Sequence, residues 1–410
     1  MNYLKNFFLK IDANEKKIIY LIYFLPIALL MGSLIINLTI FLICIFFIYE
    51  LMIKKKIKKF LNIYTYFFLI IFIYLILNSV FIGKNIDGLI RAIGFLRFII
   101  LAIAIAYYLN IENKKYENKI LYFWSIIFII VSLDLLFEFV LGFNILNFKS
   151  GYPGRLAGFT GDELKIGGFY FGFILLSLTY IKYNKSNLFI FSLIFFFVIA
   201  YLIGERSNFI KIFLMILPFY FILYNSNVFK KIFYLSIPVI IILLITIADA
   251  KFKQRFFYYF INPIIKNNLE ESLSKDKHIS HYRLAIDIFK NNKLFGVGIK
   301  NFRHESYHRS VNLGHKIAVT THPHQIHFEF LSEIGIIGYI LLMSFLFYTI
   351  FNGFLIYRTK NDIAALSATL FIIATILPIL PSGSFFTTYG ATIFWINFSF
   401  ICRHNYNYNK

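Results

Sequence analysis

Three histidines stand close together near the C-terminal end of the sequence, at His322, His324 and His327. An imidazole titrates near neutral pH, so histidines in such a group can act as a general base, contact a phosphate or bind a metal. His-x-His spacing is known among zinc ligands, but no cysteine or aspartate lies nearby and Glu329 is the only close carboxylate. Acid–base or phosphate chemistry is therefore the favoured interpretation, ahead of a metal site or a merely solvated cluster.

Arginines make up a second group of candidates. Arg155 lies in a glycine-rich segment, Arg206 stands in a very short loop between two apolar runs, and Arg283 and Arg303 lie on either side of a glycine-containing turn. Guanidinium groups keep their charge and can hold phosphate oxygens with two parallel hydrogen bonds. A single arginine of this kind could equally contact lipid headgroups. Several of them together indicate a bound anion.

Four further ionisable residues fall inside apolar runs: Arg91, Arg97, Asp134 and Glu138. Charges at membrane depth are costly and usually face a protein interior or a cavity. Asp134 and Glu138 are four residues apart and share one helix face. Two interpretations stay open, namely arginine–carboxylate pairing between neighbouring helices and direct contact with a substrate, for which Arg97 is a candidate.

The elements that must position these residues are transmembrane helices. The chain has 410 residues, of which 59% are hydrophobic and only 15% are charged, whereas soluble domains carry about 25% charged residues. Its apolar residues cluster in runs of roughly 17–25, which is long enough to cross a bilayer as helices. The runs lack the alternation of barrel strands. The sequence therefore predicts an all-α polytopic membrane protein embedded in the lipid bilayer.

About twelve transmembrane helices are expected, and a long apolar stretch is divided at Gly32-Ser33. The predicted spans are 18–32, 34–53, 61–82, 88–108, 120–141, 166–182, 187–203, 208–224, 232–248, 327–350, 363–380 and 385–402. Every second loop is rich in lysine and arginine, which places both termini in the cytoplasm. The chain then divides into a bundle at 1–248, a long periplasmic loop at 249–326 and a second bundle at 327–410.

The long loop is expected to contain short helices. Tyr282, Ala285, Ile286 and Phe289 recur with helical spacing and predict a short amphipathic helix. The segment 294–298, with two glycines, predicts the end of that helix and a turn. The loops at 142–165 and 204–207 are expected on the same, outer face.

Some functions are disfavoured by the same observations. The formal charge is +21, but many of the cations lie in short loops where they orient the spans, so nucleic acid is not an expected partner. Cys44 lies inside one predicted span and Cys402 at the end of another, which makes a disulfide or a cysteine-based metal site improbable. A transporter or flippase is an alternative of a different class. The polar residues gather at one face, however, rather than along a path through the bilayer.

The arginine segments and the histidine segment, in their order along the chain, resemble the O-antigen ligase family. This family includes O-antigen ligases, O-antigen polymerases and protein O-oligosaccharyltransferases. The matching segments are Arg155-Leu-Ala-Gly158, Glu205-Arg206-Ser207, Arg283-Leu-Ala-Ile-Asp-Ile-Phe289 with 294–302, and the histidine segment 322–338. The resemblance is most specific between about 280 and 340. One departure is Gln325, where the family typically has asparagine; both side chains are amides.

The resemblance implies a metal-independent glycosyltransferase of the GT-C type, without a cofactor, in the bacterial inner membrane. Its donor would be a polyprenyl-diphosphate-linked glycan, and its acceptor would be lipid A–core or another glycan. By this resemblance His324 is the base that activates the acceptor hydroxyl, and Arg206 and Arg283 are catalytic residues that hold the diphosphate. Arg155, His322 and Arg303 are supporting substrate-binding residues.

The resemblance covers three kinds of acceptor. A ligase uses lipid A–core, a polymerase uses another lipid-linked repeat, and a protein glycosylation enzyme uses a serine or threonine hydroxyl. The histidine segment is most similar to the ligase branch, so the ligase is the expected activity. A polysaccharide polymerase is the alternative.

Overall fold

The computed structural model describes residues 2–54, 62–110, 115–163, 165–261, 277–312 and 319–405. Helices dominate these residues, and no β-strand occurs among them. Seven long helices come first: α1 Asn2–Leu30, α2 Ser33–Lys54, α3 Ile63–Leu77, α4 Ile86–Asn110, α5 Lys115–Leu141, α6 Ile166–Asn184 and α7 Phe189–Leu202. They are followed by α8 Arg206–Leu223, α9 Val228–Ala248, α15 Ile326–Lys360, α16 Ile363–Thr375 and α17 Thr388–Cys402.

Every predicted span overlaps one of these helices. Eight helices in the described part of the chain are long and apolar enough to cross a membrane, and Ser186–Leu202 and Ile363–Thr375 are shorter apolar helices. The multi-pass helical prediction is thereby confirmed, while the count of twelve spans and the GT-C architecture stay predictions. The division of the first apolar stretch is correct, because the chain breaks between α1 and α2 at Gly32, where φ is +103°.

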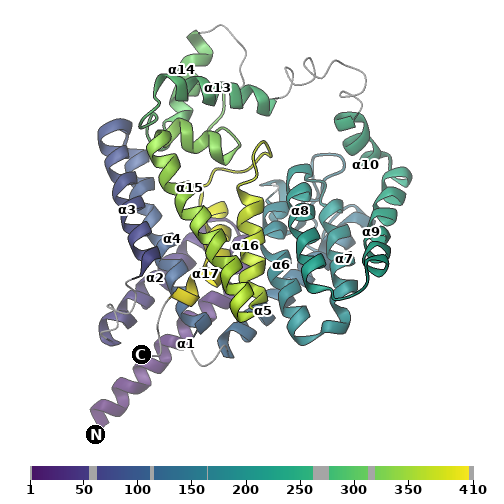
Figure 1. The fold of residues 1–410 in the computed structure, drawn as a ribbon, viewed down its shortest axis with the longest axis horizontal. Coiled ribbons are helices and arrows are strands. Elements are labelled where there is room, and N and C mark those ends of the chain that lie inside the picture. Colours follow the sequence, from purple (N-terminus) through teal and green to yellow (C-terminus); the bar gives the residue numbers. More distant parts are fainter. Residues whose placement is uncertain are drawn as a thin grey trace.

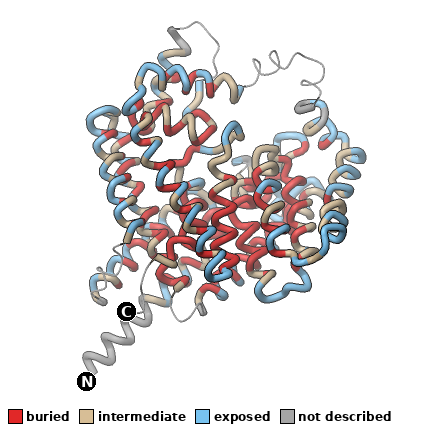
Figure 2. Tube along the Cα trace, in the orientation of Figure 1, coloured by how far each residue is buried: buried red, intermediate tan, exposed pale blue. Residues whose placement is uncertain are grey.

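Exposed apolar side chains cover the outside of the bundle. On α9 only Pro238 is buried, and Phe229, Leu244 and Ile247 are exposed. Such a surface would be unfavourable in water, but it is the normal surface of a helix that faces lipid. Figure 2 shows the exposed faces at the sides of the bundle and the buried residues in its middle.

The centre of the bundle is built around α17. This helix packs on α4 and α16, and α16 in turn packs on α6, α8 and α15. Large aromatic side chains fill the space: Trp395 of α17 lies edge-on against Phe68 of α3 and Phe95 of α4, and Phe345 of α15 stacks on it. Such ring pairs add to the packing energy beyond simple burial.

The segment between α9 and α15 contains short helices, as expected for a long loop. They are α10 Ala250–Phe252, the π-helical turn η6 Lys253–Ile261, α13 Lys277–Asn291 and α14 Phe302–Asn312. Figure 1 shows α13 and α14 at one end of the bundle and the marks for both chain termini at the other end. The division into three parts at 248 and 326 stays a prediction.

The amphipathic helix is present as α13, but its buried face differs from the prediction. Tyr282 and Ala285 are buried as expected, whereas Ile286 is exposed and Phe289 is only partly buried. The buried face instead continues through Leu284 and Ile288. The helix packs on α15 with this face, and the tertiary contact therefore turns the apolar stripe by about one residue from the one inferred from spacing alone.

The helix α15 is broken near its start, at Gly335. The backbone there has φ +67° and ψ −173°, a conformation that is essentially restricted to glycine. The turn after α13 wraps around the break: Val297 N donates to Ser332 O at 2.9 Å, Gly298 N to Glu333 O at 2.8 Å, and Ile336 N to Lys293 O at 2.9 Å. The break thus falls inside the span predicted at 327–350. A short helix from Ile326 to the break carries His327, and the helix after the break continues to Lys360.

We expect Gly335→Ala to destabilise the fold at this junction. A Cβ atom would meet Leu294 O at 2.4 Å and Gly296 N at 2.5 Å, and alanine disfavours the backbone conformation. The free energy of unfolding should fall by at least about 1–3 kcal/mol. Thermal unfolding in detergent measures this, with Gly94→Ala as the control, because a Cβ at Gly94 meets nothing within 4 Å. Equal melting temperatures for the two variants would contradict the assignment.

Candidate functional site

Four histidines from two segments form one cluster. His322 and His324 come from the loop before α15, and His278 and His281 come from the first turns of α13. The ring of His324 lies 4.0 Å from that of His322, 5.3 Å from that of His281 and 5.4 Å from that of His278, measured between ring centroids. The structure therefore places His324 in the middle of the cluster.

The loop backbone fixes the position of His324. Its φ is +59°, a conformation that is uncommon for residues other than glycine and that is often found at functional sites. Ser382 N donates to the His324 carbonyl at 2.7 Å and holds the turn in place. The next residue, Gln325, is the N-cap of α15, and its side-chain oxygen accepts from His327 N at 2.7 Å and Phe328 N at 3.1 Å. The longer amide at this position thus still caps the helix.

One contact assigns the tautomer of His324. The Thr320 hydroxyl donates to His322 O at 3.1 Å, and the same oxygen lies 3.3 Å from His324 Nε2. A hydroxyl has only one proton to donate, so Nε2–H of His324 is the donor in the second contact. The lone pair of the neutral ring is then on Nδ1, which is the nitrogen available to accept a proton.

Both central histidines are kept neutral by their surroundings. Burial lowers the pKa of His324 from 6.5 to about 3, and the neighbouring rings of His322, His278 and His281 lower it further. Burial also lowers the pKa of His322 to about 4, followed by the charge of Lys300. A cation placed near other positive charges loses stability, so the neutral form is favoured. At neutral pH each ring therefore has a lone pair with which to accept a proton.

A second polar group lies at the start of α8. Arg155 pairs with Glu205, and Arg255 of η6 donates through Nε to Gly204 O. Burial lowers the pKa of Arg255 to about 10, and the charges of Arg155 and Arg206 lower it further. Arg206 is the first residue of α8, where the helix dipole already favours an anion. Three guanidinium groups therefore meet one carboxylate at a helix N-terminus.

Close backbone contact brings these arginines together. Leu156 N donates to Ile203 O at 3.2 Å, and a Cβ atom on Gly204 would meet Gly154 O at 1.9 Å. Gly204 has φ +74°, so the turn needs glycine for its conformation as well as for its space. The glycine-rich loop of Arg155 and the short loop of Arg206 are thus locked against each other.

The carboxylates inside α5 do not pair with the arginines of α4, so the interpretation of interhelical ion pairs is wrong for the described residues. Glu138 accepts from Ala157 N at 2.8 Å and from Gly158 N at 2.7 Å. Asp134 likewise accepts from Ile145 N at 3.0 Å and Asn144 Nδ2 at 3.3 Å. Backbone N–H groups at the bundle end need acceptors, and these carboxylates supply them. Glu138 thereby holds the loop that carries Arg155.

The segment between α16 and α17 contacts the histidine cluster and also α8, the helix that begins with Arg206. Ser382 holds His324 as described above, and the adjacent Pro381 carbonyl accepts from Lys211 Nζ of α8 at 2.9 Å. Lys211 is buried, about one and a half turns from Arg206 along α8. The Tyr282 hydroxyl of α13 donates to Ile379 O in the same segment at 3.1 Å. One short connection is therefore attached both to the histidine cluster and to α8, the helix that begins with Arg206.

The remaining candidates lie in different surroundings. The side chain of Arg283 is exposed on α13, next to the buried Tyr282 and Leu284. Arg97 donates to Thr388 Oγ1 at 3.1 Å and lies over the ring of Phe98, within the bundle. These positions do not bring Arg283 or Arg97 into the histidine cluster. A direct substrate role for either residue stays a prediction.

His327 has a role in holding the fold. Its Nε2 lies 2.7 Å from the carbonyl of Ile376, and its Nδ1 lies 3.1 Å from the Tyr339 hydroxyl. A carbonyl only accepts hydrogen bonds, so Nε2 carries the proton. The third histidine of the motif therefore ties the start of α15 to the end of α16.

Several residues in the site were missed by sequence reasoning. The His278-Ile-Ser-His281 spacing, which puts two rings on one face of a helix, was an available signal. Lys300 lies beside His322, and Arg255 lies beside Arg206, in segments without any local pattern that marks them. Within the described residues, no group of three or more His, Cys, Asp or Glu side chains has a geometry that could hold a metal ion.

Comparison with known proteins matches one part of the chain to a family. The family model described as O-antigen ligase matches residues 191–343. The chain carries an O-antigen ligase family domain. A search of curated proteins gives no match.

The O-antigen ligase domain contains most of the site. Its match begins within α7 and ends within α15, so it includes α8 with Arg206, α13 and the histidine segment. Arg155 and its supporting residue Glu138 precede the match, and Ser382 follows it. The O-antigen ligase domain is thus completed by segments on both sides of it.

We expect Glu138→Gln to loosen the loop that carries Arg155. The two short hydrogen bonds to Ala157 N and Gly158 N lose their charge assistance, and one of the donors loses its acceptor. Amide hydrogen exchange at 155–158 should become at least about tenfold faster, which corresponds to about 1.4 kcal/mol. Ser125→Ala, in the same helix, is the control. Unchanged exchange at 155–158 would show that Glu138 does not hold the loop.

Proposed function

We propose that this protein is a membrane glycosyltransferase that moves a glycan from a polyprenyl diphosphate to an acceptor hydroxyl, acting as an O-antigen ligase on lipid A–core. The observation that carries the proposal is the central position of His324 in the histidine cluster, which is linked through Ser382 and Pro381 to Lys211 of α8, the helix that begins with Arg206. The family match supports the same chemistry. The reaction would take place at the periplasmic face of the inner membrane.

In this mechanism the acceptor hydroxyl gives its proton to Nδ1 of His324 as its oxygen bonds to the anomeric carbon of the donor sugar. The bond from that carbon to the diphosphate oxygen breaks, and its electron pair leaves with the diphosphate. Negative charge grows on the leaving group, so positioned cations lower the barrier. A neutral, well-placed imidazole contributes typically a factor of about 10²–10⁴ to the rate.

The arginine group at the start of α8 is suited to the diphosphate. Arg206 and Arg255 present permanent charges at a helix N-terminus, and such a site binds phosphate oxygens well. Arg155 contributes a third guanidinium, which would then contact both Glu205 and the ligand. Arg283 would have to turn inward from its exposed position to take part.

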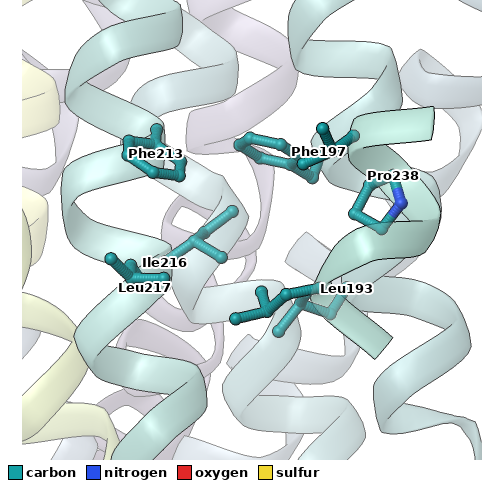
Figure 3. A pocket seen from close by; sticks show the side chains of 8 residues that line it. Leu193, Phe197, Phe213, Ile216, Leu217 and Pro238 are labelled. Atoms are coloured by element: carbon teal, nitrogen blue, oxygen red, sulfur yellow. The ribbon is translucent and has the colours of Figure 1, made fainter. Parts of the chain in front are cut away.

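An apolar cavity supports a donor that carries a lipid chain. It measures about 220 Å³ and lies between α7, α8 and α9. Figure 3 shows Phe197 and Leu193 on one side and Phe213, Ile216 and Leu217 on the other, with Pro238 of α9 closing it. Phe213 is about two turns, or ~10 Å, from Arg206 along α8. A hydrocarbon chain attached to an anion at Arg206 could therefore extend into this cavity.

Gene deletion tests the proposed function. In the source organism, loss of a ligase should leave bare core while the lipid-linked polymer accumulates. A gene carrying His324→Ala should fail to restore the glycan although the protein inserts normally, because the base is missing. His308→Ala is the control, since this histidine is exposed on α14.

Other surface-glycan patterns would overturn the proposal. Core bearing a single repeat identifies a polymerase, and donor trapped on the cytoplasmic side identifies a transporter. Full restoration of the glycan by the gene carrying His324→Ala would show that His324 is not the base.

The pH dependence of transfer tests the state of the base. The pKa of His324 is lowered to about 3, so the folded enzyme keeps a neutral imidazole at pH 5 as well as at pH 7. We therefore expect kcat/KM for the acceptor to stay within about twofold between pH 7.5 and pH 5. A base with the ordinary pKa of about 6.5 would lose roughly 30-fold at pH 5. A tenfold loss per pH unit starting near pH 6.5 would contradict the lowered pKa.

A further inference from the structure

A third set of charges, which the mechanism above does not use, lies beside His322 of the histidine cluster. The three charges are Arg91 in α4, Lys300 in the turn before α14, and Arg303 in α14. They lie close enough together to act on one another electrostatically. The start of α4 is docked against this segment: Asn85 Nδ2 donates to Asn301 Oδ1 at 3.0 Å, and a Cβ on Gly88 would meet Ile299 O at 2.6 Å. This arrangement, named here the cation triad, is therefore built by the fold.

The nearby carboxylates do not neutralise the triad by direct pairing. Glu329 accepts from the Ser384 hydroxyl and from Phe385 N at 2.8 Å. Glu333 accepts from backbone groups of Lys300 and Phe302. Among the ion pairs of the described residues, none involves a member of the triad. Both acids therefore use their hydrogen bonds to hold neighbouring segments in place, and they act on Arg91 and Lys300 only through their charge.

Two buried nitrogen atoms beside the triad have no protein partner. Arg303 Nε and His322 Nε2 are inaccessible to solvent and have no hydrogen-bond partner among the described residues. The other ring nitrogen of His322 lies 3.1 Å from the Thr321 hydroxyl, and Arg91 donates to Phe386 O at 2.9 Å through Nη1. A buried donor without a partner destabilises the protein, and it does so more strongly when it is charged. A bound anion would remove this cost.

We propose that Arg91, Lys300, Arg303 and His322 bind an anionic group, a phosphate or carboxylate, on the acceptor glycan. This rests on the proposed function, because it assigns the second substrate of the same site. The donor diphosphate is attached to hydrocarbon, so it belongs with Arg206 beside the apolar cavity. Lys300 and Arg303 of the triad instead lie beside His322, whose ring centroid is 4.0 Å from that of His324. An anion held there puts a hydroxyl of a neighbouring sugar within reach of the base.

This assignment makes the enzyme selective for acidic acceptors. A neutral glycan would leave the triad and the two buried nitrogens unsatisfied, and a site built for a charged group rejects an analogue that lacks it. Substrate choice is then set by Arg303 and its neighbours rather than by the base. The arginine group at α8 would not contribute to the selection of the acceptor.

Acceptor binding in the absence of donor tests this inference independently of transfer. The full-length protein in lipid nanodiscs is titrated with lipid A–core from the source organism, and with the same material after its phosphates are removed and its carboxyl groups reduced. Arg303→Gln should weaken binding of the untreated acceptor by roughly 10–100-fold, as expected for one lost charge-assisted contact. It should not change binding of the neutralised acceptor, and Arg303→Lys should restore part of the affinity.

Arg309→Gln provides the matched control. Arg309 is on the same helix, but it already pairs with Asp287 and, at 3.2 Å, with Glu305. This variant should bind both acceptors like the wild type. The inference is overturned if Arg303→Gln weakens both acceptors equally, if wild-type protein binds them equally, or if Arg303→Gln instead weakens binding of the polyprenyl-diphosphate donor. Tight binding of the acidic acceptor without any transfer would support the site while rejecting the proposed reaction.

Discussion

The site depends on how the backbone N–H and C=O groups find hydrogen-bond partners where α15 breaks. A helix that ends within a membrane protein leaves N–H and C=O groups without partners, and in a place without water these groups must find partners inside the protein. At Gly335 they find them in the turn that follows α13, through the pairs of Val297 with Ser332 and Gly298 with Glu333. The same turn carries Lys300. One set of backbone hydrogen bonds therefore fixes the histidine segment, α13 and the cation triad relative to each other.

Burial and charge act in the same direction at the histidines. A neutral imidazole survives close to several cations because burial and the nearby positive groups both disfavour its protonation. At the arginine group the balance differs, since a guanidinium stays charged even when burial lowers its pKa, as it does for Arg255. The fold can thus keep a base neutral and its neighbouring anion sites charged within one region.

The sequence predicted the helical membrane class, the positions of the apolar segments and the grouping of His322 with His324, because these depend on local composition and a compact motif. It could not predict that His278 and His281 complete the cluster, since that depends on which face of α13 packs on α15. The same tertiary contact turned Ile286 outward and left Arg283 exposed. Spacing alone also could not show that Glu138 binds the loop at Ala157 and Gly158, because the acceptor and its donors lie in different elements.

The two groups of cations would act on the base in different ways during the reaction. Burial lowers the pKa of His322, and the charges of Lys300, His281 and Arg303 lower it further. Burial also lowers the pKa of His324, and His322 is the first of the neighbouring rings that lower it further. An anion bound at the triad would offset part of these positive charges and so raise the basicity of both rings. The imidazole would then become a stronger base only when an acceptor is in place. Without an acceptor, it would stay a weak base beside a reactive donor, which would limit wasteful transfer to water.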